Sequence, residues 1–309
     1  MDRLTVSSSP HIRHQDSSKG IMFDVIISLL PLTAAGCIMY GWYSLLLVVV
    51  TVAAAVLSEY ICCKVMKRRN SIYDLSAVVT GLILALNFPP LLPLWMAVIG
   101  SVIAIVVVKM MFGGIGHNFA NPAITARIAL LVSFPSAMTA WVAPKGTEVI
   151  TGATDATSMA TPLTTDGYSY TQLLTGKIPG SLGETFKFLI ILAFLYLVIR
   201  RVISPVIPLV TVGTVALMSV IFGLDPLYMI LSGGLLFGAV FMATDYVTSP
   251  INWKGHIIYG VGIGAITFLI RHFGYLPEGV SYAILLMNLF VPYINRIAAP
   301  KPFGWEAKK

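Results

Sequence analysis

Residues 74–90, DLSAVVTGLILALNFPP, form a short apolar segment that begins with an acid and ends at two prolines. Residues 225–239, DPLYMILSGGLLFGA, follow the same order of acid, apolar turn, hydroxyl residue, glycine, leucine-rich run and alanine. The two segments are five predicted membrane spans apart, and an odd offset reverses the direction of the second copy. The pattern predicts two inverted repeats of five helices; chance similarity between glycine- and leucine-rich helices is the alternative.

The composition is that of a polytopic membrane protein. Apolar residues make up 57% of the chain and charged residues 11%, whereas about a quarter of a soluble domain is charged. Basic residues flanking the spans on the cytoplasmic side explain the net charge of +7, so we expect no nucleic-acid partner. The first 20 residues lack an apolar core followed by a cleavage site, which favours a cytoplasmic tail over a signal peptide. The three cysteines form no CxxC pair, which argues against a disulfide framework, a zinc site or a four-cysteine iron-sulfur cluster.

The hydropathy pattern predicts about ten transmembrane helices, since each span needs about 20 mostly apolar residues. We place them at residues 21–40, 43–63, 73–89, 91–109, 122–142, 186–203, 205–222, 226–243, 255–271 and 279–297. Lysine and arginine concentrate in the tails and even-numbered loops, so both termini are expected in the cytoplasm and the loop at 143–185 outside it. The predicted divisions are a tail at 1–20, a first repeat at 21–142, the extracytoplasmic loop at 143–185, a second repeat at 186–297 and a tail at 298–309.

The extracytoplasmic loop contains DATSMATPL at residues 155–163. Its spacing of Asp155, Ser158, Ala160 and Thr161 resembles the site at which a flavin transferase joins FMN, through its phosphate, to a threonine oxygen. Thr161 would supply the exposed hydroxyl, the small Ala160 would let the transferase close around it, and Asp155 and Ser158 would be recognition groups. The ring would stay free for redox chemistry, so the threonine is expected to be a tether and not a catalytic residue.

Two alternatives apply to this loop. Thr154, in the neighbouring TGAT sequence, is a second and lower-ranked attachment residue. Clusters of Ser, Thr and Asp are also what ordinary loops contain.

Two predicted cytoplasmic loops end in proline, one at residues 112–123 and one at 243–250. Glycines that permit close backbone approach, followed by Asn118, Asn121 and a helix amino terminus, could hold the polar ring edge or ribityl chain of a flavin. A structural turn that caps the following helix is an equally good interpretation.

Ionisable residues within membrane spans are energetically costly and are candidates for function. The candidates for an ion path are Asp24, Glu59, Asp74, Asp225 and Asp245. Arg127 is expected to be buried, as is Asp24, and to face a flavin or pair with an acid.

Several of these residues also have a purely structural explanation. Glu59 lies about one turn before Lys64, and an ion pair at the membrane face would explain it. Asp74 and Asp225 could cap helix starts. His117 has no second ligand at suitable spacing, and no metal site is predicted.

Taken together, these motifs resemble the NqrB/RnfD family of membrane subunits, and Met159 in place of a typical glycine favours the Rnf branch. The matching regions, in order along the chain, are residues 9–11 with 21–22, 74–90, 113–123, 155–163 and 243–250. The resemblance implies a fold similar to that of urea transporters, in agreement with the inverted repeat.

The resemblance also implies a function. The chain would be a subunit, not catalytically complete alone, of a cell (inner) membrane oxidoreductase complex that passes electrons between ferredoxin and NAD+ and moves Na+ or H+. FMN on Thr161 would be an outer-face carrier, and a second, non-covalent flavin such as riboflavin would lie near Asn118 and Asn121. Since the chain has no NAD fingerprint and no ferredoxin-type cysteine run, those chemistries would belong to partner Rnf subunits.

Two other classes compete with this interpretation. A small-solute channel of urea-transporter type would account for the inverted repeat but not for a modifiable threonine on the outer loop. A membrane scaffold for redox partners would tolerate substitution of the intramembrane charges.

Overall fold

The computed structural model describes residues 17–68, 71–142, 144, 163, 168–274 and 279–300, and within them the chain is helical without a β-strand. The helices of the first half are α1 (Ser18–Tyr40), α2 (Trp42–Val65), η1 (Ile72–Asp74), α3 (Ser76–Leu86), α4 (Leu94–Val102), η2 (Ile103–Met110), α5 (Pro122–Ser133) and α6 (Pro135–Met138). Those that follow are α7 (Tyr170–Thr175), α8 (Lys187–Ile199), α9 (Val206–Ile221), α10 (Pro226–Leu231), α11 (Leu235–Phe237), η3 (Gly238–Met242), α12 (Trp253–Phe273) and α13 (Val280–Ala298).

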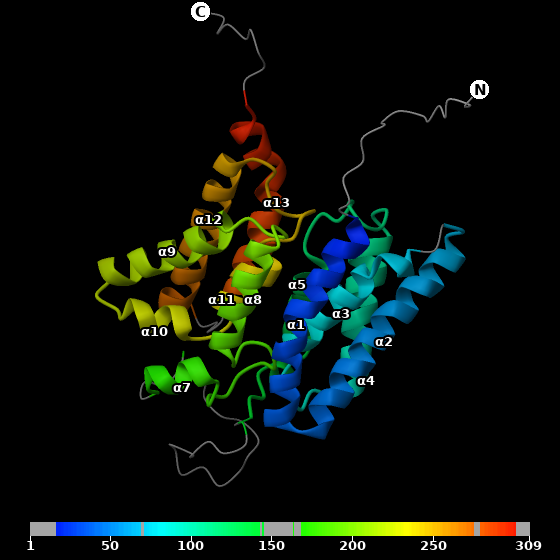
Figure 1. Ribbon diagram of the computed structural model, residues 1–309, viewed down its shortest axis with the longest axis horizontal. Helices are drawn as coiled ribbons and strands as arrows, with labels where there is room; N and C mark the ends of the chain where they lie inside the picture. Colours follow the sequence, from blue (N-terminus) through cyan, green and yellow to red (C-terminus); the bar gives the residue numbers. More distant parts are fainter. Residues whose placement is uncertain are drawn as a thin grey trace, which may run out of the picture.

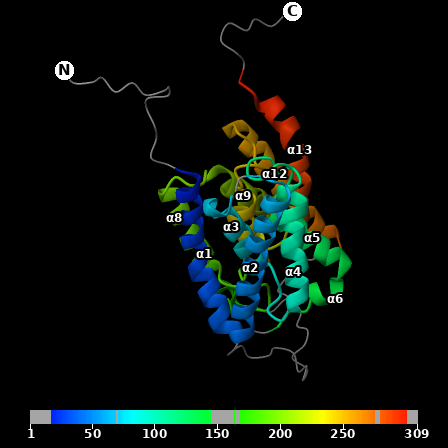
Figure 2. The ribbon, with the colours of Figure 1, turned by 90° about the vertical axis from the view of Figure 1, so that its right-hand side faces the viewer.

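The helices form two groups, α1–α6 and α8–α13, which meet where α1 packs on α8 and α5 on α13 (Figure 1). The first turn of α1 and the last turn of α13 lie at the same end of the bundle in both views (Figures 1 and 2). The short helix α7 lies at the opposite end (Figure 1). The described chain therefore enters and leaves the bundle on one side.

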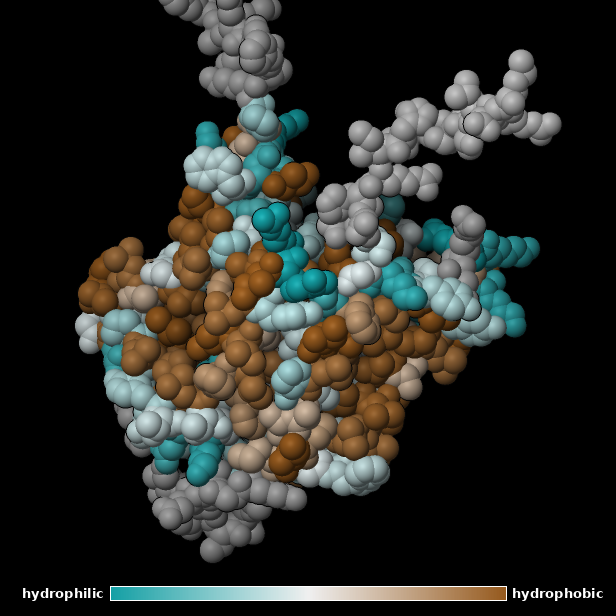
Figure 3. Space-filling model, in the orientation of Figure 1, coloured by the Kyte–Doolittle hydropathy of each residue, from teal (hydrophilic) through white to brown (hydrophobic). Residues whose placement is uncertain are grey.

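The surface fits a protein that sits in a membrane. Four of the described helices, α1, α2, α12 and α13, are long and apolar enough to cross a bilayer, and α3, α4 with η2, α5, α8 and α9 are shorter apolar helices. Figure 3 shows hydrophobic residues across the middle of one face and hydrophilic residues gathered above and below them. An all-helical, multi-pass membrane protein is thus confirmed at this level.

Helix α3 is shorter than the span expected at residues 73–89, because both of its ends are fixed locally. Leu75, directly before it, has a left-handed backbone with φ of 64°, which breaks continuity with η1. At the other end, helical conformation stops at Asn87, two residues before Pro89. The result is an 11-residue helix that is too short to cross a bilayer alone.

The span expected at residues 226–243 is also interrupted. Ser232 is extended, Gly233 has φ of +59°, and the helix resumes only at Leu235. A Cβ on Gly234 would lie 2.4 Å from Oε1 of Glu184. Glycine is therefore needed at this break for backbone freedom at one position and for close approach at the next.

The segment at residues 178–185 is not helical, yet each of its residues is buried. It runs against the carboxyl end of α3, where the amide of Gly183 donates to the Leu86 carbonyl at 2.7 Å and that of Leu182 donates to the Phe88 carbonyl at 3.3 Å. Irregular backbone is tolerated at membrane depth only inside protein or along a cavity, and these contacts place it inside protein. The last part of the expected outer loop thus belongs to the core.

Candidate functional site

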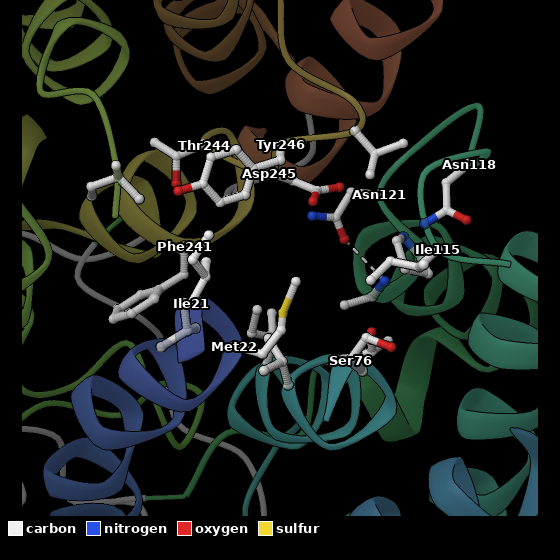
Figure 4. Close-up of a pocket in the computed structure, with 18 of the residues that line it drawn as sticks. Ile21, Met22, Ser76, Ile115, Asn118, Asn121, Phe241, Thr244, Asp245 and Tyr246 are labelled. Atoms are coloured by element: carbon white, nitrogen blue, oxygen red, sulfur yellow. Dashed lines mark hydrogen bonds between the residues drawn. The ribbon is translucent and has the colours of Figure 1, made fainter. Parts of the chain in front are cut away.

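A partly open pocket lies between the two groups of helices. Its walls come from the start of α1, from α3, from the loop before α5, and from η3 with the loop that follows it. In Figure 4, Asn121 and Asp245 lie on one side of the pocket, and Met22 and Ser76 lie on the opposite side. The structure thus brings together both cytoplasmic loops that the sequence singled out.

Asn121 has a structural role, as the capping interpretation predicted. Its Oδ1 accepts hydrogen bonds from the amides of Ala123 (3.0 Å) and Ile124 (3.3 Å) at the start of α5, with Pro122 at the first helical position. Its Nδ2 donates to the Met242 carbonyl at 3.2 Å. The side chain therefore joins the start of α5 to the end of η3 while it lines the pocket.

Asn118 differs from Asn121 because its Oδ1 is buried and accepts no hydrogen bond from the described residues. The loop that carries it turns on Gly113, Gly114 and Gly116, which have φ of 131°, 95° and 89°. Only glycine adopts these angles readily, so the loop geometry depends on them. The loop leaves the side-chain amide of Asn118 at the pocket wall.

Glu59 pairs with Lys109, and the expected pairing with Lys64 was wrong. Lys109 Nζ lies 2.9 Å from Glu59 Oε2, and the two side chains are 2% and 0% exposed. Lys109 also donates to Ser76 Oγ at 2.6 Å, and Ser71 donates to Glu59 Oε1. The sequence put Lys64 within one turn of Glu59, but only the packing of η2 on α2 brings Lys109 to the buried face.

Arg127 is buried, as expected, and pairs with an acid. One guanidinium nitrogen, Nη1, donates to Asn87 Oδ1 at 2.8 Å, to Ser281 Oγ at 3.1 Å and to Glu184 Oε1 at 3.3 Å. The arginine thereby joins α5, the end of α3, the start of α13 and the buried segment at 178–185.

Sequence reasoning missed Glu184 because it stands in a polar stretch assigned to the outer loop. Lys187, at the start of the span expected at 186–203, is fully buried and donates to the carbonyls of Glu184 and Gly233. The sequence did contain a signal for these buried charges: an acid stands three residues before a lysine at the edge of an apolar span.

The other ion-path candidates lie apart from one another. Asp24 is only partly buried and pairs with Arg200 at 3.1 Å, so the prediction that Asp24 is buried is confirmed only in part. Asp74 accepts from the amide of Ser76 at 2.9 Å, and Asp225 caps α10, so both do act at helix starts. Asp245 lines the pocket and accepts from Thr248 at 3.0 Å.

The predicted flavin-attachment residues, Asp155, Ser158, Ala160 and Thr161, lie outside the described residues, as does Thr154. Leu163, two positions after Thr161, is described, and its Cδ1 lies 2.7 Å from where a Cβ on Gly233 would stand. Among the described residues, no cluster of His, Cys, Asp and Glu could hold a metal ion.

Comparison with known proteins gives a consistent result. Residues 5–304 match the NQR2, RnfD, RnfE family. The chain is 43% identical over 303 residues, covering 97% of this chain and 95% of the relative, to the D subunit of the Na(+)-translocating ferredoxin:NAD(+) oxidoreductase complex of Acetobacterium woodii. It is 41% identical, over 97% of this chain and 96% of the relative, to the D subunit of the proton-translocating ferredoxin:NAD(+) oxidoreductase complex of Clostridium ljungdahlii. It is 40% identical, over 93% and 92%, to the D subunit of the ion-translocating oxidoreductase complex of Stutzerimonas stutzeri. The chain therefore belongs to the NQR2, RnfD, RnfE family.

Proposed function

We propose that this chain is the flavin-carrying membrane subunit of an Rnf-type complex that couples electron transfer between ferredoxin and NAD+ to movement of Na+ or H+. The observation that carries the proposal is the full-length similarity, at 43% and 41% identity, to D subunits named for those activities. Ferredoxin and NAD+ would be bound by other subunits, because this chain has no motif for either. The relatives' names give no support to a solute channel.

In this proposal Thr161 carries FMN on the outer face of the cell membrane, attached by a flavin transferase that recognises Asp155, Ser158 and Ala160. The sequence pattern supports the attachment.

We assign a second, non-covalent flavin such as riboflavin to the pocket. The described residues suit such a ring, since the lining of the pocket is mostly apolar and includes the amide of Asn118. Apolar side chains such as Met22 and Ile83 would cover the ring faces, and Asn118 and Thr80 would accept or donate hydrogen bonds at its edge. When bound, a flavin supplies electron-transfer chemistry, and the protein supplies its placement and electrostatics.

The packing supports two inverted repeats and a urea-transporter-like arrangement of about ten spans. Helix α2 packs on α4 as α9 packs on α12, and α3 packs on α1 as α11 packs on α8. Helices α1 and α8 run in opposite directions, because Asp24 near the start of α1 meets Arg200 after α8, and Gly36 near the end of α1 meets Leu182 before α8. Opposite directions are what an inverted pair requires.

The attachment is tested by in-gel ultraviolet fluorescence of the denatured chain after co-expression with a flavin transferase. Fluorescence lost in Thr161→Ala and kept in Thr154→Ala, with FMN on the loop peptide by mass spectrometry, is the expected result. A dark wild-type band, with the transferase active on another substrate, would contradict the proposal.

Ion coupling is tested separately with Asp24→Asn. We expect impaired ion transport with the flavin still attached, since the substitution removes the charge but not the tether. Unchanged ion transport by that variant would remove Asp24 from the ion path.

A further inference from the structure

The wall of the pocket contains one buried cation, Lys109, at the end of η2. Its ammonium group donates to Glu59 and to Ser76, and Ser76 also lines the pocket. A lysine ammonium has three N–H donors, and the described residues accept two from Lys109. A buried donor without an acceptor is unfavourable, so the third N–H calls for an acceptor in the pocket.

Glu59 reduces the positive electrostatic potential that Lys109 exerts on a ligand in the pocket. The carboxylate of Glu59 is fully buried and held from both sides, by Lys109 on Oε2 and by Ser71 on Oε1. On the pocket side, Ser76 donates to Asp74, which lies just before α3. The acid across the pocket is Asp245, which is held by Thr248 and not by Lys109. Glu59 therefore neutralises part of the charge of Lys109, and the third N–H of the ammonium group is left for an acceptor in the pocket.

We propose that Lys109 stabilises the electron-rich, reduced form of the flavin in this pocket, and that Glu59 limits how much of that positive charge the ring meets. This rests on the proposed second flavin. Two electrons taken up with one proton add one negative charge to a flavin ring, and the electrons come from the redox partners of the proposed complex. A cation beside the ring favours that state over the neutral oxidised one. Lys109 is a positioning and tuning residue of the site.

Substitution of Lys109 and substitution of Glu59 should shift the midpoint potential of the flavin in opposite directions. An ion pair with a purely structural role would not produce such opposite shifts. Removal of the cation in Lys109→Gln should weaken binding of reduced relative to oxidised flavin at least tenfold, which lowers the midpoint potential by about 30 mV for a two-electron couple. Removal of the anion in Glu59→Gln should raise the potential by a shift of the same order. Lys109→Arg, which keeps the charge, should stay close to the wild-type potential.

The measurement is a spectroelectrochemical titration of the full-length chain in detergent, in a Thr161→Ala background so that only non-covalent flavin absorbs. Lys64→Gln is the matched control, because it removes a cation one turn from Glu59 that does not line the pocket; its potential should be unchanged. Size-exclusion chromatography checks that each variant is folded. If Lys109→Gln does not fold, the raised potential of Glu59→Gln and the unchanged potential of Lys109→Arg decide the question.

Shifts of the same sign in Lys109→Gln and Glu59→Gln, or no shift in Glu59→Gln, would overturn the inference and leave the second flavin in place. A background chain that releases no flavin on denaturation would overturn the second flavin and the inference with it. Covalent attachment at Thr161 would stand in either case.

Discussion

The ion pairs Arg127–Glu184 and Lys109–Glu59 are equally buried but differ in what surrounds them. Both pairs have side chains at most 5% exposed. Arg127 is enclosed by acceptors from several elements, whereas Lys109 lies at the wall of a cavity. The enclosed pair can act only on the fold, while the pair at the cavity can also act on a ligand. Burial of charge therefore does not by itself mark the functional site.

The largest expected effect is on the enclosed pair. Arg127→Met would leave Glu184 as a buried, unpaired carboxylate and should lower the free energy of unfolding by about 3–5 kcal/mol. Denaturant unfolding in mixed micelles measures it. Ser281→Ala removes one acceptor from the same arginine and should cost about 1 kcal/mol. Equal losses in the two variants would mean that the charge pair contributes nothing beyond a single hydrogen bond.

The close approach around Glu184 is tested by Gly234→Ala. The new Cβ would stand 2.4 Å from Oε1 and 2.7 Å from Cδ of Glu184, so the carboxylate must leave its present position beside Arg127 or the backbone must shift. We expect a loss of about 1–3 kcal/mol in the free energy of unfolding. Gly213→Ala, inside α9 with no atom within 4 Å of the new Cβ, is the control and should be neutral or stabilising. A neutral Gly234→Ala would show that Glu184 is not held tightly.

A substitution in the pocket should change ligand binding more than the free energy of unfolding. Asn118→Ala removes the amide from the pocket wall, and we expect about tenfold weaker retention of non-covalent flavin, equivalent to about 1.4 kcal/mol. The free energy of unfolding of the flavin-free chain should change little, because no described residue donates to Asn118 Oδ1. Flavin released on denaturation gives the occupancy. Full retention of flavin together with a large loss of stability would assign Asn118 to the fold.

The smallest effect concerns a surface contact outside the spanning helices. The hydroxyl of Tyr170 on α7 donates to Asp225, which lowers the pKa of that carboxyl below its ordinary value of 3.8. The stabilisation is therefore present above pH 3.8 and is lost as the pH falls through the lower pKa of the folded state. Because the pair is exposed and screened by water, Tyr170→Phe should lower the melting temperature only slightly at neutral pH. Thermal melts should show a smaller difference between wild type and variant at pH 3 than at pH 6; an equal difference at the two pH values would exclude Asp225 as the cause.

Several parts of the fold could be predicted because their causes are local. The short α3 follows from the acid at its start and the prolines after it, and the break before α11 follows from Gly233 and Gly234. The asparagine cap on α5 likewise depends on Asn121 and Pro122 alone. The number of spans and the inverted repeat stay predictions, supported by the packing.

Those features of the site that depend on local sequence could also be predicted. The loop with Asn118 and Asn121 and the loop with Asp245 were identified by composition, but their meeting at one pocket depends on how η3 packs against the start of α5. Burial of residues 178–185 could not be predicted, because its polar composition matches that of a surface loop.

By itself the sequence determined the helical membrane class, the family and the residues that interrupt helices, since these depend on composition, order and local backbone preference. Only the tertiary structure decided the partners of the buried charges. Glu59 and Lys109 are 50 residues apart, and Arg127 and Glu184 are 57 apart. A charge in an apolar interior is stabilised by whichever opposite charge the packing brings within a few ångströms, and distance along the chain does not determine that.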